Sequence, residues 1–250
     1  MLALRSLLFN ILMFSTVVVY AILSLFTAPF PALTRYRFIS LWARLQVWLL
    51  KVVCNLTYRV EGEENLPSGP AIILAKHQSS WETLAFQIIF PPQVWVLKRE
   101  LLLIPFFGWG LALTQPIAIN RGGGSRALEQ IVTQGRERLD RGRWVVVFPE
   151  GTRVGPGQNK RHGIGGSVLA AETGYPVVPV AHNAGSFWPR RGFIKRPGTI
   201  RVVIGPVIDS HGRSAQQIRD TAEQWMRQTM TSLENHSGHG RQPSRPKEVA

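Results

Sequence analysis

The chain opens with a long apolar segment. No charged residue occurs between Ser6 and Thr34, and the stretch from Leu7 to Phe30 is almost wholly apolar. As an α-helix it would extend roughly 35 Å, enough to cross a hydrocarbon layer about 30 Å thick. A cleaved signal peptide is the competing interpretation, but its apolar region normally covers only about 7–15 residues. The segment predicts a membrane helix, which either spans the bilayer or lies in one leaflet.

The next segment, from Arg35 to Leu56, carries apolar residues at helical spacing. Arg37, Arg44 and Lys51 recur every seven residues and therefore share one helical face. We expect a basic face opposite a face rich in Trp and Leu, a combination that suits the membrane interface. Packing against a soluble domain gives the same pattern, and both interpretations can hold together. Basic residues after an apolar segment favour a cytoplasmic location for the remaining chain.

From Tyr58 onward, short apolar runs alternate with amphipathic stretches. The runs predict strands at 58–61, 71–75, 94–97, 115–119, 144–148, 177–183 and 199–205. The amphipathic stretches predict helices at 81–90, 125–141, 166–173 and 214–233. Strands that alternate with helices indicate an α/β fold with a largely parallel sheet flanked by helices.

The same pattern divides the chain into three parts. Residues 1–56 form the membrane-associated helix pair, and residues 57–234 form one α/β domain, long enough for a sizeable core. Residues 235–250 are polar and rich in Pro and Gly. A tail of this composition is predicted to be disordered, because it cannot bury enough apolar surface to fold.

The charge balance adds information about partners. Lys and Arg number 29 against 15 Asp and Glu, a formal net charge of +14. Such an excess attracts membrane lipids, nucleic acid or phosphorylated substrates. We expect an anionic membrane lipid and no nucleic acid, since the sequence has no recognisable nucleic-acid-binding module. The single cysteine, Cys54, can form neither an internal disulfide nor a Cys-based metal site, and no metal is predicted.

Polar clusters follow several of the expected strands. They are KHQSSWE after 71–75, NRGGGSR after 115–119, PEGTR after 144–148 and HNAG after 177–181. In open α/β sheets, sites form at the carboxyl ends of the strands. The clusters therefore predict one site at that edge of the sheet.

His77 directly follows an expected strand, and Glu82 lies five residues further on. A chain that turns from strand to helix can bring Glu82 back to the imidazole. A carboxylate on one ring nitrogen fixes the tautomer and leaves the other nitrogen as a general base. The alternative is a capping box, in which Ser79 is the N-cap and Glu82 bonds its amide. Taken alone, these residues favour neither interpretation.

The segment KHQSSWE, residues 76–82, resembles the first motif of the glycerolipid acyltransferase family, and closely that of the 1-acylglycerol-3-phosphate acyltransferases. That motif is His, four residues and then an acid. Further blocks follow in the family's order, at Ile119-Asn120-Arg121, 148–153 and 177–181. The stretch between the first two blocks is also similar, through Lys98, Glu100, Leu101, Pro105 and Gly108. The family's acid is usually Asp, whereas this chain has Glu82.

The resemblance implies transfer of a fatty acyl group from acyl-CoA or acyl carrier protein to the sn-2 hydroxyl of lysophosphatidic acid. The product would be phosphatidic acid, as in phospholipid synthesis. No metal or redox cofactor is implied. The helix pair at the amino terminus fits bacterial members, so we expect the inner (cytoplasmic) membrane with the active site facing the cytoplasm. His77 is expected to take the acceptor proton, and Glu82 to orient it.

The acceptor phosphate calls for positive charge near the base. The resemblance assigns phosphate contact to Arg121, and guanidinium can bind phosphate through two parallel hydrogen bonds. It assigns substrate contact to the third block, in which the candidates are Glu150, Gly151, Thr152 and Arg153. Lys98 and Lys160 are further candidates. Glu150 is expected to hold the glycerol hydroxyl or to brace Arg153, and Gly151 to permit a close backbone approach or a positive φ.

Two other functions fit the same residues. One is an O-acyltransferase that acts on another lyso-lipid. The other is a non-catalytic membrane protein that binds anionic lipid. Acyl transfer by a His77→Ala protein separates catalysis from binding, and competition between acceptors identifies the lipid.

Overall fold

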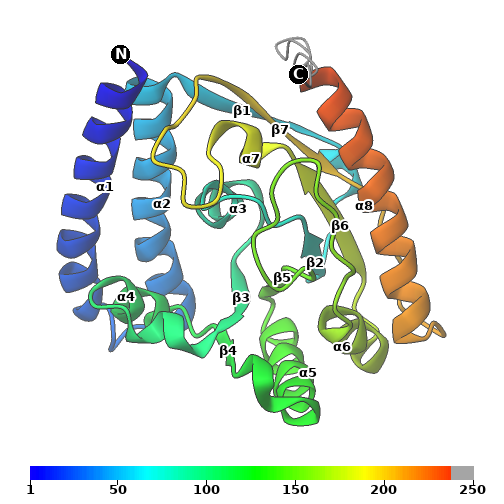
Figure 1. The fold of residues 1–250 in the computed structure, drawn as a ribbon. Coiled ribbons are helices and arrows are strands. Elements are labelled where there is room, and N and C mark those ends of the chain that lie inside the picture. Colours follow the sequence, from blue (N-terminus) through cyan, green and yellow to red (C-terminus); the bar gives the residue numbers. More distant parts are fainter. Residues whose placement is uncertain (238–250) are drawn as a thin grey trace, which may run out of the picture.

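The computed structural model describes residues 1–237. The tail predicted to be disordered is 235–250, but residues 235–237 are helical, and the rest of the tail lies outside the described residues. The described chain folds around a seven-stranded sheet flanked by helices, which confirms the predicted α/β class (Figure 1). The strands are β1 (Leu56–Glu61), β2 (Ile72–Ala75), β3 (Gln93–Lys98), β4 (Ile117–Ile119), β5 (Trp144–Val147), β6 (Val177–His182) and β7 (Gly198–Ile204). The helices are α1 (Leu2–Leu25), α2 (Ala32–Cys54), α3 (Trp81–Ile89), α4 (Phe107–Leu113), α5 (Ser125–Asp140), α6 (Gly165–Thr173), α7 (Ala184–Phe187) and α8 (Ala215–Ser237).

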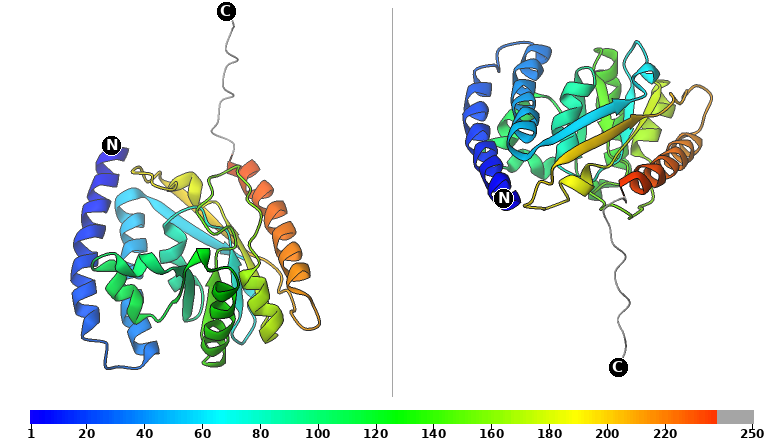
Figure 2. Two further views of the ribbon diagram at one scale, coloured as in Figure 1. Left: turned by 60° about the horizontal axis from the view of Figure 1, so that its bottom comes forward. Right: turned by 90° about the horizontal axis from the view of Figure 1, so that it is seen from above.

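The sheet has the order β1-β7-β6-β2-β5-β3-β4, and its strand pairs are parallel except β6 with β7. Successive side chains of β2 point to opposite faces, as the pleat requires. Ile73 packs into the cluster that contains α2 and α3, and Ile72 packs into the cluster that contains α5 and α6. Helices therefore cover both faces of the sheet (Figure 2).

Five short elements of the described chain were not predicted. They are α4, α7 and the 3-10 helices η1 (Glu63–Asn65), η2 (Arg99–Leu103) and η3 (Arg121–Gly123). Before α4, Phe106 has φ 62° and ψ −64°, and the amide of Phe107 donates to the carbonyl of Pro105 at 2.7 Å. This is a γ-turn of the rare, strained kind. A seven-residue helix that holds two glycines and follows such a turn gives too little helical periodicity to detect.

Helices α1 and α2 form an antiparallel hairpin along one flank of the domain (Figures 1 and 2). Helix α1 is long and apolar enough to cross a membrane, by length and composition alone. Some of its polar side chains are nevertheless turned toward protein. Thr16 Oγ1 accepts from Trp42 Nε1 at 3.2 Å and from Gln46 Nε2 at 3.0 Å. These contacts join the two helices to each other. Lys195 Nζ donates to Asn10 Oδ1 at 2.6 Å, which fastens the hairpin to the domain.

The outer face of α2 differs from the predicted one. Arg37, Arg44 and Lys51 are exposed, but exposed Leu41 and Trp48 lie among them rather than opposite. Residues spaced alternately by four and three fall on one side of a helix, which explains the mixture. The expectation of a basic face opposite the Trp and Leu residues is therefore wrong in this respect. The exposed stripe is both basic and apolar.

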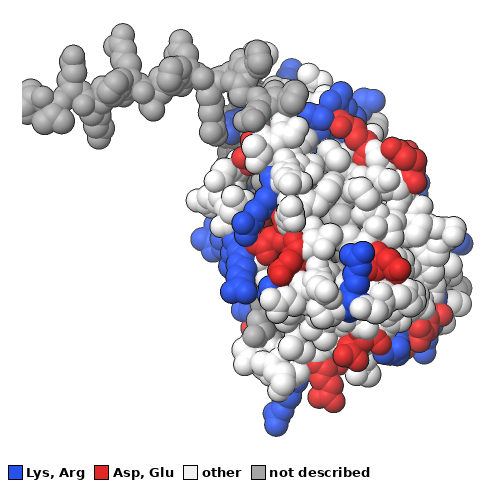
Figure 3. All heavy atoms as spheres, turned by 90° about the vertical axis from the view of Figure 1, so that its right-hand side faces the viewer, with Lys and Arg blue, Asp and Glu red and all other residues white. Residues whose placement is uncertain are grey.

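Helix α8 covers the long loop between β5 and α6. On this side of the molecule, acidic and basic side chains lie next to one another on a largely uncharged surface (Figure 3). Arg219 pairs with Asp220, and Arg227 pairs with Glu223. Beneath them lies buried His162, whose amide donates to Glu223 Oε2 at 3.3 Å. Its Nδ1 has no hydrogen-bond partner among the residues that the structure describes.

Lowering the pH should reduce the unfolding free energy of the protein through His162. Burial lowers the pKa of His162 to about 4. The charge of Glu223 acts in the opposite direction but is the smaller effect. Between the unfolded value of about 6.5 and the folded value, the unfolded chain binds more protons, so stability falls as the pH falls. From pH 7 to 5 this group alone should remove about 2 kcal/mol of unfolding free energy. Urea unfolding in detergent at the two pH values should show a smaller loss for His162→Leu than for the native chain.

The matched control is His211→Leu, which removes an exposed histidine of a surface loop. Its unfolding free energy should change with pH as that of the native chain does. If the unfolding free energy of His162→Leu depends on pH as that of the native chain does, His162 is not the source of the acid destabilisation.

Candidate active site

Strand β2 leads directly into the site. It ends at Ala75, and Lys76 and His77 follow directly. The amide of Lys76 donates to the carbonyl of Val180 at 2.9 Å, and the amide of Val154 donates to the carbonyl of His77 at 2.8 Å. His77 therefore stands at the carboxyl edge of the sheet, where the polar clusters after the strands predicted a site.

The Glu82 carboxylate faces His77 from the first turn of α3. Its Oε1 lies 2.9 Å from His77 Nδ1 and accepts from the amides of Gln78 at 2.9 Å and Ser79 at 2.8 Å. One carboxylate thus contacts the imidazole and the two amides that precede the helix, including the Ser79 amide that the capping box predicted. The N-cap is Ser80 rather than the expected Ser79, whose hydroxyl instead accepts from the amide of Trp81 at 3.1 Å.

Electrostatics keep the Glu82 carboxylate ionised. Its complete burial raises the pKa, but His182, His77 and the Ser79 amide outweigh that effect and lower it. An ionised acceptor at Nδ1 places the ring proton there, so Nε2 is the nitrogen that can accept a proton. The hydrogen-bond partners assign this tautomer.

His182 supports the same stretch of chain from β6. It is fully buried, its Nε2 lies 2.8 Å from the carbonyl of Lys76, and its Nδ1 accepts from the amide of Ala184 at 3.3 Å. Burial lowers the pKa of His182, and both contacts are those of a neutral ring. His182 therefore lies behind the Lys76 carbonyl and is not part of the pocket wall that contains His77.

The imidazole of His77 is also held from the side. Its ring is stacked on Phe148, with ring centres 4.0 Å apart and planes 13° from parallel. Phe148 in turn stacks on Trp95 of β3 at 5.7 Å. The His77 imidazole, Phe148 and Trp95 thus form one stack, which limits rotation of the imidazole about its side-chain bonds.

A pocket of about 420 Å³ opens beside His77. This volume lies in the range of roughly 300–1,000 Å³ that is usual for ligand sites. Its wall is mostly apolar and comes from the helix pair as well as the domain, including Val17, Tyr20, Ala21, Ile39, Trp42, Leu84, Leu97, Phe107 and Leu111. His77 and Arg153 are polar members of the same wall. A long apolar ligand with one anionic end fits such a lining.

Arg153 is the predicted cation that the structure brings to the base. Burial lowers its pKa and the charge of Glu82 opposes that change, yet guanidinium stays protonated in proteins. Its carbonyl accepts from Arg190 Nη1 at 3.3 Å, which adds positive charge beside it. Thr152 is partly buried in the same loop, and Gly151 has φ +68°, the left-handed conformation that favours glycine.

The other predicted site residues lie elsewhere. Lys98 is half-exposed at the end of β3 and pairs with Glu100 at 3.0 Å. Lys160 is exposed and borders a small second cavity beside His162. The backbone of Arg121 begins the 3-10 helix η3 (Arg121–Gly123) after β4, and its side chain lies outside the described structure.

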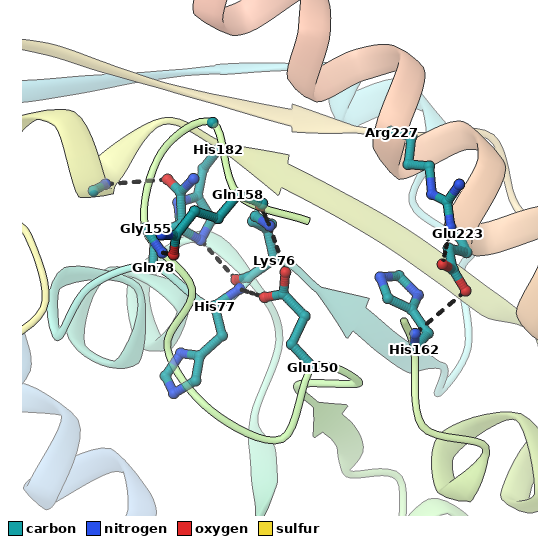
Figure 4. Close-up of polar contacts among 12 residues, drawn as sticks. Lys76, His77, Gln78, Glu150, Gly155, Gln158, His162, His182, Glu223 and Arg227 are labelled. Atoms are coloured by element: carbon teal, nitrogen blue, oxygen red, sulfur yellow. Dashed lines mark hydrogen bonds and ion pairs between the residues drawn. The ribbon is translucent and has the colours of Figure 1, made fainter. Parts of the chain in front are cut away.

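Glu150 adopts neither of its expected arrangements. Its side chain is only 1% exposed and contacts Lys76 Nζ and the amide of His77, rather than the pocket or Arg153 (Figure 4). Sequence reasoning assigned no role to Lys76 or Phe148. A lysine at the end of a wholly buried strand was the available signal, because lysine is seldom buried unless it is paired.

Among residues 1–237, no group of three or more His, Cys, Asp or Glu side chains is arranged to hold a metal ion. The site combines an oriented imidazole, an apolar pocket and a guanidinium. Together they can remove a proton from an alcohol that is held by its anionic group.

Known proteins share this organisation. Residues 57–183 match the model of the Acyltransferase family. The chain is 47% identical over 236 residues to a 1-acyl-sn-glycerol-3-phosphate acyltransferase of Pseudomonas aeruginosa, covering 92% of each protein. It is 30% identical to the enzyme of that name from Saccharomyces cerevisiae, over 71% of this chain and 62% of the relative.

A solved structure has the same fold. The crystal structure of the 1-acyl-sn-glycerophosphate (LPA) acyltransferase PlsC from Thermotoga maritima superposes with a TM-score of 0.76 and 23% identity. The match covers 96% of this chain and 97% of that one, so it includes the helix pair. The sequence motifs, the geometry around His77 and these matches agree, and the chain belongs to the acyltransferase family.

Proposed function

We propose that the protein transfers a fatty acyl group from acyl-CoA or acyl carrier protein to the sn-2 hydroxyl of lysophosphatidic acid, which yields phosphatidic acid for phospholipid synthesis. The observation that carries this proposal is an imidazole braced by a buried carboxylate on the wall of an apolar pocket that it shares with Arg153. The names of the relatives support the acceptor. The proposed reaction uses no metal or redox cofactor.

His77 acts as the base in the proposed reaction. Its Nε2 takes the hydroxyl proton of the acceptor while the oxygen attacks the thioester carbonyl carbon. The carbon–sulfur bond then breaks, and the imidazolium can return the proton to the departing thiolate. The ionised Glu82 stabilises the imidazolium in between. Because a thiol has a pKa of about 8.5, the thiolate departs with little need for a proton donor.

The apolar pocket wall and Arg153 would bind different parts of the acceptor. The apolar wall suits a fatty chain, whose burial is favourable by about 0.8 kcal/mol for each methylene. Arg153, together with Arg121 as the resemblance implies, suits the phosphate. We assign weaker phosphate contacts to Lys98 and Lys160. The binding roles of Thr152 and Gly151 would arise from the turn that presents Arg153.

We further propose that the helix pair lies at the inner (cytoplasmic) membrane, in contact with anionic lipid, and that the active site faces the cytoplasm. Exposed apolar residues of α1, such as Phe14, support membrane contact. So do exposed Leu103 and Trp109 near α4, which packs against α1. The mixed basic and apolar stripe of α2 suits the headgroup region.

Replacing His77 by Ala should abolish most acyl transfer. Loss of a general base costs on the order of 10²–10⁴ in rate. The measurement is labelled acyl transfer to lysophosphatidic acid by purified protein, with circular dichroism to establish folding. The control His211→Ala, at an exposed histidine, should retain native activity. Native activity in a folded His77→Ala protein would reject the mechanism.

Phosphate recognition should depend on Arg153 and Arg121. A lost charge-assisted hydrogen bond costs about 1.5–3 kcal/mol, so each Arg→Ala change should lower kcat/KM for lysophosphatidic acid roughly 10- to 150-fold. The same variants should change the much lower activity on monoacylglycerol, which has no phosphate, by less than about threefold. Equal losses on both acceptors would favour another lyso-lipid as the natural acceptor. Competition between lysophosphatidic acid and other lyso-lipids tests the native enzyme directly.

Membrane contact can be measured with spin labels, since Cys54 is the only cysteine. In a Cys54→Ala background, nitroxides at Phe14→Cys and Leu103→Cys should become more accessible to oxygen than to a polar nickel complex when phosphatidylglycerol vesicles are added. A label at Glu137→Cys, half-exposed on α5, is the control and should stay in water. Water-like accessibility at both test positions would exclude the proposed membrane face.

A further inference from the structure

Lys76 and Glu150 form a buried ion pair directly behind the proposed base. Their side chains are only 4% and 1% exposed, and Lys76 Nζ donates to Glu150 Oε1 (Figure 4). A buried pair loses the hydration of both ions, and apolar residues of the same volume are often as stable. Stability alone is therefore a weak explanation for placing these charges beside His77.

The second oxygen of Glu150 indicates another role. Glu150 Oε2 accepts from the backbone amide of His77 at 2.9 Å. In Figure 4 the carboxylate lies between the Lys76 ammonium and that amide, while the imidazole points away from it. The carboxylate therefore contacts the main chain of His77 and leaves the imidazole to Glu82.

The neighbours of Glu150 complete a cradle for His77. Phe148 stacks on the imidazole, and the amide of Val154 donates to the carbonyl of His77. The loop from 148 to 154 thus contacts the amide, the carbonyl and the ring of one residue. In this chain, Arg153 of the family's third block lies on the pocket wall. The glutamate of the same block, Glu150, contacts the backbone of His77 instead.

We propose that Lys76 and Glu150 are positioning residues: Lys76 fixes the Glu150 carboxylate, and that carboxylate fixes the backbone of His77 so that the imidazole meets Glu82 and the pocket at once. The inference rests on the proposed role of His77 as the base. Neither residue touches substrate.

An ion pair suits this role better than a neutral contact. Hydrogen bonds between charged groups are about twice as strong as neutral ones, so the two oxygens have well-defined partners. Burial raises the pKa of the Glu150 carboxyl, and Lys76 and the His77 amide oppose that rise. Without the Lys76 ammonium, the carboxyl is free to take up a proton and turn, and the amide of His77 loses its acceptor.

The test compares Lys76→Met and Glu150→Gln with the native enzyme. Glu150→Gln keeps the shape and one acceptor oxygen, so it provides a second probe should Lys76→Met fold poorly. Because a displacement of about 1 Å at a reacting group can cost about 100-fold, kcat should fall roughly 10- to 100-fold while KM for lysophosphatidic acid stays within about twofold. The double variant should lose about as much as either single variant, since both act through one contact.

Lys195→Met is the matched control. It removes another buried lysine, which fastens α1 to the domain and has no contact with the site. Its melting temperature should fall, but kcat per folded enzyme should stay native within about twofold. If the site variants lower kcat no more than this control does, the pair is only structural and the proposal fails. A raised KM with unchanged kcat would place Glu150 on the substrate and also overturn it.

A spectroscopic measurement separates this inference from the reaction itself. In protein with ¹⁵N-labelled histidine in micelles, the His77 ring signals are identified by their loss in His77→Ala. They should move in Lys76→Met and Glu150→Gln and stay in place in Lys195→Met. Unmoved signals would reject the positioning role even if acyl transfer is confirmed. Moved signals would support it even if the proposed acceptor proves wrong.

Discussion

The buried carboxylate of Glu82 is the contact on which the site depends. It joins the end of β2 to the start of α3, because the same oxygen contacts the His77 ring and the two amides just before the helix. The local fold and the tautomer of the base therefore cannot be changed separately. The family's usual Asp is one methylene shorter, and Glu82 reaches the ring from the first helical turn after Ser80.

The fold and this motif could be predicted because both rest on short-range patterns. Strand alternation and helical periodicity repeat within a few residues, and each predicted strand and helix of the domain is present to within a few residues. His77 and Glu82 are only five residues apart, so one turn of chain brings them together. The strand ends then place the third block beside them, because parallel strands share their carboxyl edge.

The roles of Lys76 and Glu150 required the structure. Their contact joins segments 74 residues apart, and the sequence gives no sign of which way the Glu150 side chain turns. The same holds for Phe148, which could have been an ordinary core residue. The outer face of α2 was misjudged for another reason. Burial of that helix is decided by α1 on one side and α3 on the other, whereas the sequence pattern assumes a single apolar side.

The predicted division into a membrane anchor and a soluble domain separates elements that share one core. Phe9 of α1 and Leu50 of α2 are fully buried in the cluster that contains α3 and the central strands. Both helices also supply part of the pocket wall that His77 faces. An acyl chain bound in that pocket would lie between the hairpin and the domain. The hairpin is therefore part of the binding site, and a change on its inner face acts on the pocket while a change on its outer face acts on the surroundings of the protein.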